Sequence, residues 1–222
     1  MPEGGAGRPF ILIASSWAAG GMPIPDPAND WSGAVLAATE PAPPTDPWRG
    51  LPAVGGIDLD LMRPGESLRV DGTGAFVELL SVKETPVVTS FLEDEEGRVL
   101  LVRRSEKVGS YQGRWSGISG YQEEPTPLAQ AVKEIQEETG IAPEDLRLVA
   151  EGSPVYVRHG EEVFVVHPFR FRVPHRPVRL DWENVESEWV PPSEIPLRST
   201  VPKLDRAWEA VAVPGDRSAR KV

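Results

Sequence analysis

The chain has 222 residues, 40% of them hydrophobic, which is enough for one good core and allows a second. Its formal net charge of −11 disfavours a general nucleic-acid-binding surface, because phosphate backbones are bound largely through Lys and Arg. The absence of cysteine excludes disulfides, thiol nucleophiles and thiolate metal sites together.

The first apolar run, at residues 10–19, favours a buried strand over a secretory signal segment, because Arg8 alone is a poor basic flank. No stretch of the sequence approaches the roughly 20 apolar residues that a membrane helix requires. We therefore expect a cytoplasmic protein that makes no membrane contact.

Residues 1–84 are rich in Pro and Gly, with the clearest break at residues 41–47, and they predict a small β-rich domain. Within it, residues 51–80 resemble the end of the mobile swivelling domain of phosphoenolpyruvate-utilising enzymes, with Asp71-Gly72 as a tight turn. That family carries phosphate on a histidine of the mobile domain. All three histidines of this chain follow residue 84, so a phosphohistidine relay is excluded, and a dimerisation or substrate-covering role is what is left.

A second domain is predicted over residues 85–222. It opens with two β-rich runs, residues 85–92 and 98–104, separated by an acidic turn. Basic residues lie in or next to the segments that lead to the glycine turn at Gly120, and arginine suits bidentate phosphate contacts. The candidates for binding a small phosphorylated substrate are Arg103, Arg104, Lys107 and Arg114. Each is equally consistent with a surface charge beside an apolar strand.

Residues 127–139 predict a helix with clear boundary signals. Thr126 and Pro127 suit its N-cap and first turn, and Gly140 supplies the left-handed residue that ends it. One stripe of the helix is apolar and comprises Leu128, Ala131, Val132 and Ile135.

A second stripe of this helix is acidic and lies roughly 120° from the apolar one. Glu134, Glu137 and Glu138 are spaced three and four residues apart, so they lie side by side. Their repulsion, roughly a few tenths of a kcal/mol per pair, favours a cation between them. Mg²⁺ is expected, with Mn²⁺ as an alternative, because a hard ion takes carboxylate oxygens and shares its shell with substrate phosphates. A solvated acidic face is the other interpretation.

These residues resemble the signature of the Nudix hydrolase family. Residues 133–141 match its second half (Arg-Glu, a hydrophobe, any residue, Glu-Glu, any residue, Gly and a hydrophobe) except that Lys133 replaces Arg. The first half departs from the family: Pro125 stands where a Glu is expected, and the loop after Gly120 is one residue short. Glu123 or Glu124 would have to replace the missing carboxylate. The resemblance extends over roughly residues 86–210.

The resemblance implies an α+β fold, a Nudix-type α/β/α sandwich with a mixed sheet. It also implies Mg²⁺-dependent hydrolysis of a pyrophosphate bond in a nucleoside diphosphate-linked or nucleoside triphosphate substrate. The implied catalytic residues and metal ligands are Glu134, Glu137 and Glu138, and the implied substrate-binding residues are Arg103, Arg104, Arg114 and Gly120. An additional catalytic carboxylate is expected at Glu183 or Glu186, and the sequence does not choose between them.

Other functions stay open. The altered signature is compatible with a catalytically weak Nudix domain that senses a nucleotide or sugar nucleotide. A scaffold whose N-terminal module carries the biological role is a further alternative, and a homodimer is compatible with each. The histidines lack the spacing of a zinc site: His167 is expected to be a half-buried structural residue, and His159 and His175 are expected to face solvent.

Overall fold

The structure is a computed structural model that describes residues 11–14, 35–38, 53–54, 58–63, 66, 68–71, 76–80 and 82–212. The chain divides into two compact units, Met1–Val82 and Lys83–Val222.

The described part of the first unit consists of short strands and one 3-10 turn, η1 (Leu59–Leu61). Three strands form a parallel sheet in chain order: β1 (Ile11–Ala14), β2 (Val35–Ala38) and β3 (Ala53–Val54). β4 (Leu68–Asp71) pairs antiparallel with β5 (Phe76–Leu79). The predicted turn at Asp71-Gly72 lies partly outside the described residues, which resume at Phe76.

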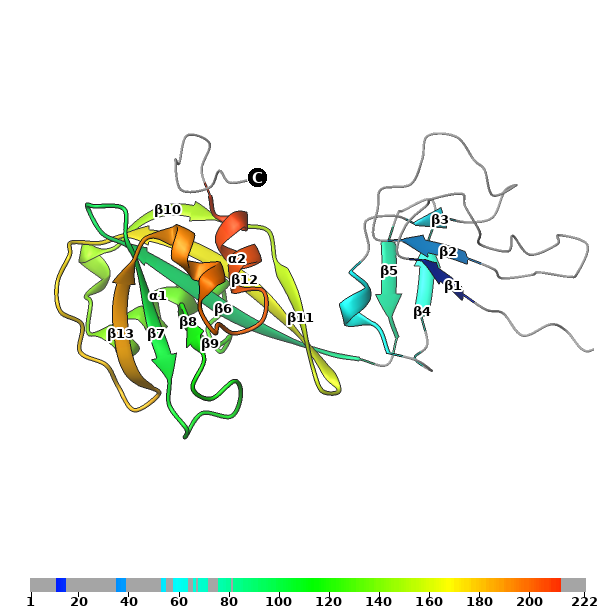
Figure 1. The fold of residues 1–222 in the computed structure, drawn as a ribbon, viewed down its shortest axis with the longest axis horizontal. Helices are drawn as coiled ribbons and strands as arrows, with labels where there is room; N and C mark the ends of the chain where they lie inside the picture. The colour runs from blue at the N-terminus through cyan, green and yellow to red at the C-terminus, as the bar shows by residue number, and fades with distance from the viewer. Residues whose placement is uncertain are drawn as a thin grey trace, which may run out of the picture. The chain divides into compact units, whose positions relative to one another are not determined.

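The second unit is built on one mixed sheet of eight strands (Figure 1). The strands are β6 (Lys83–Glu93), β7 (Val99–Arg104), β8 (Trp115–Ser116), β9 (Ile118–Tyr121), β10 (Arg147–Glu151), β11 (Val155–His159), β12 (Glu162–Arg172) and β13 (Asn184–Val190). Its main order is β10-β12-β6-β7-β13, and the central pair β6 and β12 is parallel. Three short strands pair beside this path: β8 with β7, β9 with β6, and β11 with β12. The two strands predicted at residues 85–92 and 98–104 are confirmed: the first lies within β6, and β7 covers all of the second except Arg98.

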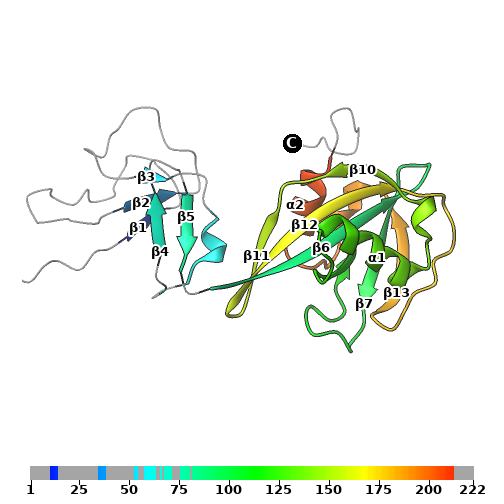
Figure 2. The same ribbon diagram turned by 180° about the vertical axis from the view of Figure 1, so that it is seen from behind.

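Helices cover both faces of this sheet, which confirms the predicted sandwich. They are α1 (Pro127–Thr139) and α2 (Leu204–Ala210), with 3-10 turns η2 (Pro143–Asp145) and η3 (Pro192–Leu197). Figure 2 shows α1 lying over β6. Neighbouring residues of one strand pack on opposite sides, because side chains alternate along a strand. Leu100 joins the core under α1, whereas Leu101 joins the core under α2. No helix of the described ranges is long and apolar enough to cross a membrane.

The histidines fit the predictions in part. His167 lies in β12 and is half-buried, as expected, and the side chain of His175 is 43% exposed. The expectation that His159 faces solvent is wrong. It ends β11, is half-buried, and its ring stacks on that of Phe164 at a centroid distance of 5.1 Å. The β11–β12 hairpin brings these two rings together.

Candidate active site

Helix α1 begins and ends where the sequence predicts. The hydroxyl oxygen of Thr126 accepts a hydrogen bond from the backbone N–H of Ala129 at 3.2 Å, and Pro127 opens the first turn. Gly140 has a left-handed φ of 71°, and its N–H donates to the carbonyl of Gln136 at 3.0 Å. Burial of the apolar stripe fixes the rotation of the helix, and the acidic stripe then meets β9.

The three carboxylates of the acidic stripe have different surroundings. Glu138 is 3% exposed; its Oε1 accepts from the backbone N–H of Ser119 at 3.1 Å, and its Oε2 accepts from the side-chain amide of Asn184 at 2.7 Å. Glu134 is half-buried and accepts from Nε2 of Gln130 at 2.6 Å. Glu137 is exposed. The stripe therefore runs from a fixed, buried carboxylate to one at the surface.

Gly120 makes room for one of these carboxylates. A Cβ placed on Gly120 would lie 1.9 Å from Oε1 and 2.8 Å from Oε2 of Glu134, far inside van der Waals contact. Gly120 belongs to β9 and does not have a positive φ, so a turn conformation is not what it provides here. It allows the carboxylate of Glu134 to lie directly against the strand.

Burial raises the pKa of Glu138 well above its usual value of 4.5, and the negative charges of Glu134 and Glu183 raise it further, whereas the hydrogen bond from Asn184 opposes the rise. Burial is also the largest cause of the raised pKa of Glu134 and of Glu183. Three carboxylates thus share a region in which their charged forms are poorly compensated. A bound cation would relieve this.

A cavity of about 370 Å³ opens beside the acidic stripe. Its charged lining comprises Arg104, Glu123, Lys133, Glu134, Glu137 and Glu183. Much of the remaining lining is apolar, with four residues from the central strands and the β11–β12 hairpin: Val87, Val157, Phe164 and Val166. The cavity therefore combines a charged region with an apolar one.

Aromatic side chains form one wall of this cavity. Tyr111, Tyr121 and Phe164 all line it. The ring of Tyr121 meets that of Phe164 edge-on at a centroid distance of 6.1 Å. The ring of His159 lies between those of Tyr111 and Phe164, at centroid distances of 5.0 Å and 5.1 Å. Tyr111 holds a positive φ of 53°, which is uncommon for a residue with a side chain. Trp182 also lines the cavity and is 59% exposed.

The predicted phosphate-binding arginines are not all brought to this cavity. Arg104 lines it, and its Nε donates to the carbonyl of Ser110 at 3.0 Å. Arg103 instead pairs with Glu186 at 2.7 Å, and Arg114 donates to the hydroxyl of Ser199. Neither Arg103 nor Arg114 is part of the lining. Arg103 is excluded because side chains alternate along β7, so Arg103 and Arg104 project to opposite faces.

The acids that could replace the carboxylate missing at Pro125 also differ in their surroundings. Lys133 pairs with Glu123 at 3.1 Å and with Glu124 at 3.6 Å, so both loop acids already have a basic partner. Glu183 lines the cavity and its charge raises the pKa of Glu134 and Glu138, whereas Glu186 is paired elsewhere. Of these acids, Glu183 is the one coupled to the α1 carboxylates.

Two amide side chains of this site were not predicted. Gln130 is 1% exposed; its Oε1 accepts from the backbone N–H groups of Glu123 at 2.9 Å and Glu124 at 2.8 Å, while its Nε2 donates to Glu134. Asn184 comes from β13 and holds Glu138. Gln130 precedes Glu134 by four residues and so lies on the acidic stripe, and this spacing is the signal that points to it. Nothing in the local sequence marks Asn184.

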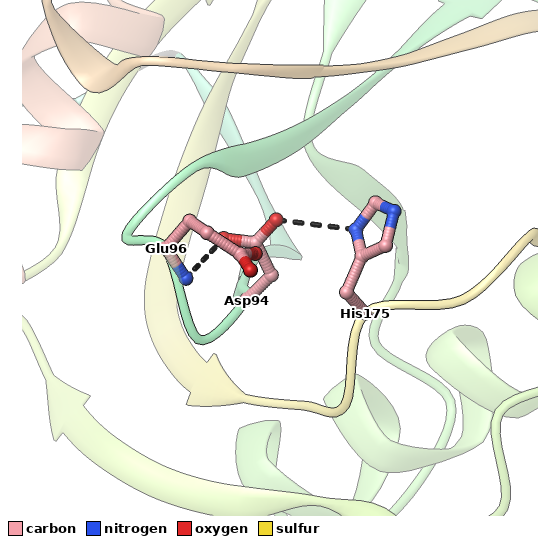
Figure 3. Close-up of side chains that lie close together, drawn as sticks. All are labelled: Asp94, Glu96 and His175. Atoms are coloured by element: carbon pink, nitrogen blue, oxygen red, sulfur yellow. Dashed lines mark hydrogen bonds and ion pairs between the residues drawn. The ribbon is translucent and has the colours of Figure 1, made fainter.

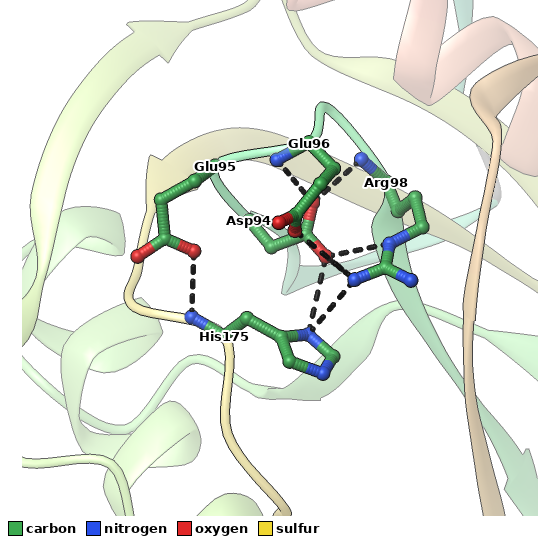
Figure 4. Close-up of polar contacts among 5 residues, drawn as sticks. All are labelled: Asp94, Glu95, Glu96, Arg98 and His175. Carbon is green, nitrogen blue, oxygen red and sulfur yellow. Dashed lines mark hydrogen bonds and ion pairs between the residues drawn. The ribbon is translucent and has the colours of Figure 1, made fainter.

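A second acidic group lies at the β6–β7 turn, away from the residues that line the cavity. Asp94, Glu96 and His175 bring one ligand atom each to within 4.8 Å of one another (Figure 3). Figure 4 shows Arg98 within this group: its guanidinium pairs with Asp94 at 2.8 Å and with Glu96 at 3.0 Å. Both acids therefore already have Arg98 as a basic partner, and the contact of Asp94 with His175 ties the turn to the segment before β13.

The residues beside the cavity fit a hard divalent cation. Their donors are carboxylate oxygens, three of the carboxylates are destabilised as anions, and Gly120 leaves space against one of them. In residues 82–212 these acids do not form as compact a trio as Asp94, Glu96 and His175. Mg²⁺ does not require one, because it keeps several waters and commonly takes one or two carboxylates together with substrate phosphates.

Several solved structures are similar to part of this chain. A MutT protein from Methanosarcina mazei is 25% identical over 57% of this chain and 91% of its own, with a TM-score of 0.49. The ORF135 protein of E. coli is 24% identical over 60% of this chain and 91% of its own, with a TM-score of 0.47. The NUDIX domain of Shewanella oneidensis NrtR, solved with ADP ribose, is 14% identical over 57% of this chain and 85% of its own, with a TM-score of 0.48. None of the curated proteins matches the chain.

The family comparison is decisive for the second unit. The sequence model described as NUDIX domain matches residues 83–211, more than half of the chain. The match begins after the segment that resembles a swivelling domain, so that weaker resemblance has no support. The chain belongs to the Nudix family of hydrolases.

Proposed function

We propose that the chain hydrolyses a pyrophosphate bond in a nucleoside diphosphate-linked or nucleoside triphosphate substrate, with Mg²⁺ as cofactor and Mn²⁺ as an alternative. Family membership supports pyrophosphate hydrolysis in general. The observation that carries the finer proposal is a single cavity with carboxylates in one part and aromatic side chains in another. A diphosphate with its metal suits the first, and a planar base suits the second.

Glu134, Glu137 and Glu138 are the proposed metal ligands. When bound, the ion supplies positive charge that neutralises the diphosphate and lowers the pKa of a water molecule. The protein holds the ligand carboxylates in place. Hydrogen bonds from Ser119 and Asn184 fix the carboxylate of Glu138, and the bond from Gln130 fixes that of Glu134.

Glu183 is the proposed general base. It lines the cavity, and burial raises its pKa, which brings a carboxylate closer to the proton affinity required of a base near neutral pH. Arg104 also lowers that pKa, so the two side chains are close enough to interact electrostatically. Arg104 is the proposed phosphate ligand, because its Nε is already held by Ser110 and its guanidinium is thereby oriented.

The aromatic wall supports a substrate that carries a base. Tyr111, Tyr121 and Phe164 offer ring surfaces, and stacking of a base on an aromatic ring contributes about 1–3 kcal/mol. The cytoplasmic location, the homodimer and the absence of a nucleic-acid partner stay predictions.

The proposal is tested by incubating the full chain with nucleoside triphosphates and nucleoside diphosphate sugars in Mg²⁺, in Mn²⁺ and in EDTA, and measuring the phosphate-containing products. We expect at least one compound to be cleaved with Mg²⁺ and none with EDTA. Tight binding without cleavage would favour the nucleotide-sensing alternative, and cleavage that persists in EDTA would contradict the metal assignment.

A further inference from the structure

One residue that lines the cavity has a buried hydroxyl without a partner among the described residues. Ser116 is 1% exposed, and its Oγ makes no hydrogen bond to any described residue. Ser116 lines the cavity. Ser90 has the same two properties, with 0% exposure and an unpartnered Oγ, but it is not part of the lining. An unpaired buried hydroxyl destabilises a fold, so an unpaired hydroxyl on a residue that lines the cavity points to a partner that enters the cavity.

Strand pairing places Ser116 on the same face as the acids. In the β7–β8 pair Ser116 is opposite Val102, whose side chain packs in the core under α1. Opposite residues of an antiparallel pair project to the same face, and so do alternate residues of one strand. Ser116 therefore shares its face with Arg104, which is two residues beyond Val102 on β7. Gly120, against which Glu134 lies, is on the same face, because it is opposite Val88 and Val88 also packs in the core under α1.

The apolar part of the cavity takes much of its lining from the other face. Val87 and Thr89 alternate with Val88 and so share the side of Phe91, which packs in the core under α2. Tyr121 is opposite Val87 and projects to that same side. Ser116 is thus grouped with the charged residues and not with the aromatic wall.

We infer that Ser116 Oγ donates a hydrogen bond to a phosphate oxygen of the substrate, next to Arg104. This inference rests on the proposed function, because it takes the ligand to be a diphosphate. Carboxylates only accept hydrogen bonds when ionised, so phosphate oxygens in this part of the cavity need donors, and Ser116 adds an uncharged one to Arg104 and Lys133. Ser116 would act in substrate binding and specificity.

The test compares Ser116→Ala with Ser90→Ala in the full chain. Each removes one buried, unpartnered hydroxyl, so both should have similar small effects on the thermal midpoint. Calorimetric Kd values are measured for ADP and for inorganic pyrophosphate in Mg²⁺. We expect Ser116→Ala to weaken both ligands by about tenfold or more, Ser90→Ala to leave both within about twofold, and Ser116→Thr, which keeps a hydroxyl, to recover binding.

The other outcomes overturn the inference in distinguishable ways. Weaker binding of ADP alone would mean that Ser116 contacts the nucleoside, and unchanged Kd values for both ligands would remove it from the site. A wild-type chain that binds both ligands but cleaves no nucleotide would reject the proposed hydrolysis, while the Kd comparison would still decide the role of Ser116. A wild-type chain that binds neither ligand would reject both.

Discussion

Gly120 is the residue at which the sequence signature and the geometry of the site meet most directly. In Gly120→Ala the new Cβ would occupy the place of the Glu134 carboxylate, from which it would be 1.9 Å away. The atom that must move is the end of a flexible side chain, so the fold should accept the change. Displacing the carboxylate by about 1 Å should lower turnover by about a hundredfold, as judged by steady-state kinetics with Mg²⁺.

Gly109→Ala is the matched control for this prediction. Gly109 also lines the cavity, but a Cβ there would meet nothing within 4 Å. Its turnover and thermal midpoint should stay close to those of the wild type. Equal turnover of Gly109→Ala and Gly120→Ala would show that the contact with Glu134 has no role in catalysis.

Glu138 makes stability depend on pH in the metal-free protein. Its folded-state pKa lies above the usual 4.5, so the folded state binds this proton more tightly than the unfolded state. The stabilisation is fully present below about pH 4.5 and is lost as the pH rises through the raised pKa. Glu138→Gln carries no such proton. In EDTA the stability of Glu138→Gln relative to that of the wild type should therefore rise between about pH 5 and pH 8.

Denaturant unfolding at the two pH values measures this gain, and Glu144→Gln, at an exposed position of η2, should show none. Mg²⁺ at the higher pH should stabilise the wild type more than Glu138→Gln, because it compensates the charge that only the wild type carries. A pH dependence that is identical in the wild type and in Glu138→Gln would contradict the burial of an uncompensated carboxylate.

The sequence predicts the three carboxylates of the site but not the side chains that hydrogen-bond to them. The spacing of Glu134, Glu137 and Glu138 follows from helical periodicity alone, and the structure places all three on α1. Asn184 reaches Glu138 across a separation of 46 residues, and such contacts depend on tertiary packing that local pattern does not encode. The same reason accounts for His159, whose partner ring becomes visible only when the hairpin forms.

At the scale of elements, α1 is the best-predicted part of the fold, because its caps and its apolar stripe agree with each other. The strands β6 and β7 were also predictable from their apolar runs. The loop before α1 was not predictable. Pro125 and the shortened spacing did not show whether Glu123 or Glu124 replaces the missing carboxylate, and the pairing of both with Lys133 depends on how the loop folds back on the helix.

The segment that enters β13 carries the next prediction. Glu183 lines the cavity, whereas Glu186 pairs with Arg103 at 2.7 Å outside it. Removing a general base typically costs about a hundredfold or more in kcat, so Glu183→Gln should lose that much turnover. Glu186→Gln breaks one exposed ion pair, which stabilises by about 1 kcal/mol at most, and should leave kcat nearly unchanged. If Glu186→Gln were the slower variant, the assignment would have to be reversed.

At the scale of the whole molecule, every proposed catalytic group lies in the second unit, Lys83–Val222. We therefore predict that a chain starting at Val82 folds and keeps the turnover of the full chain. It must include Lys83, because β6 begins there and pairs with β12, where Lys83 and Thr85 both contact Glu162. Circular dichroism and kinetics on the two chains measure this, and a folded truncation without turnover would show that the first unit completes the site.

The cavity, which combines charged and aromatic residues from separate segments, could not be predicted from the sequence. Its lining comes from strands β6 to β9 and the loop before β8, from α1 and the β11–β12 hairpin, and from the segments before β13 and before α2. The mixed sheet brings these segments together only after its register is set. The aromatic wall and the unpartnered Ser116 hydroxyl become visible as parts of one site at this scale.

The carboxylates of α1 are proposed to carry metal-dependent hydrolysis, and turnover of the best substrate in Mg²⁺ measures their role. Glu134→Gln and Glu138→Gln keep side-chain size but remove the charge that holds a hard ion, so each should lose about a hundredfold or more, while Glu144→Gln should match the wild type. If Glu134→Gln and Glu138→Gln both keep wild-type turnover in Mg²⁺, the acidic stripe is a solvated face and the catalytic assignment is wrong.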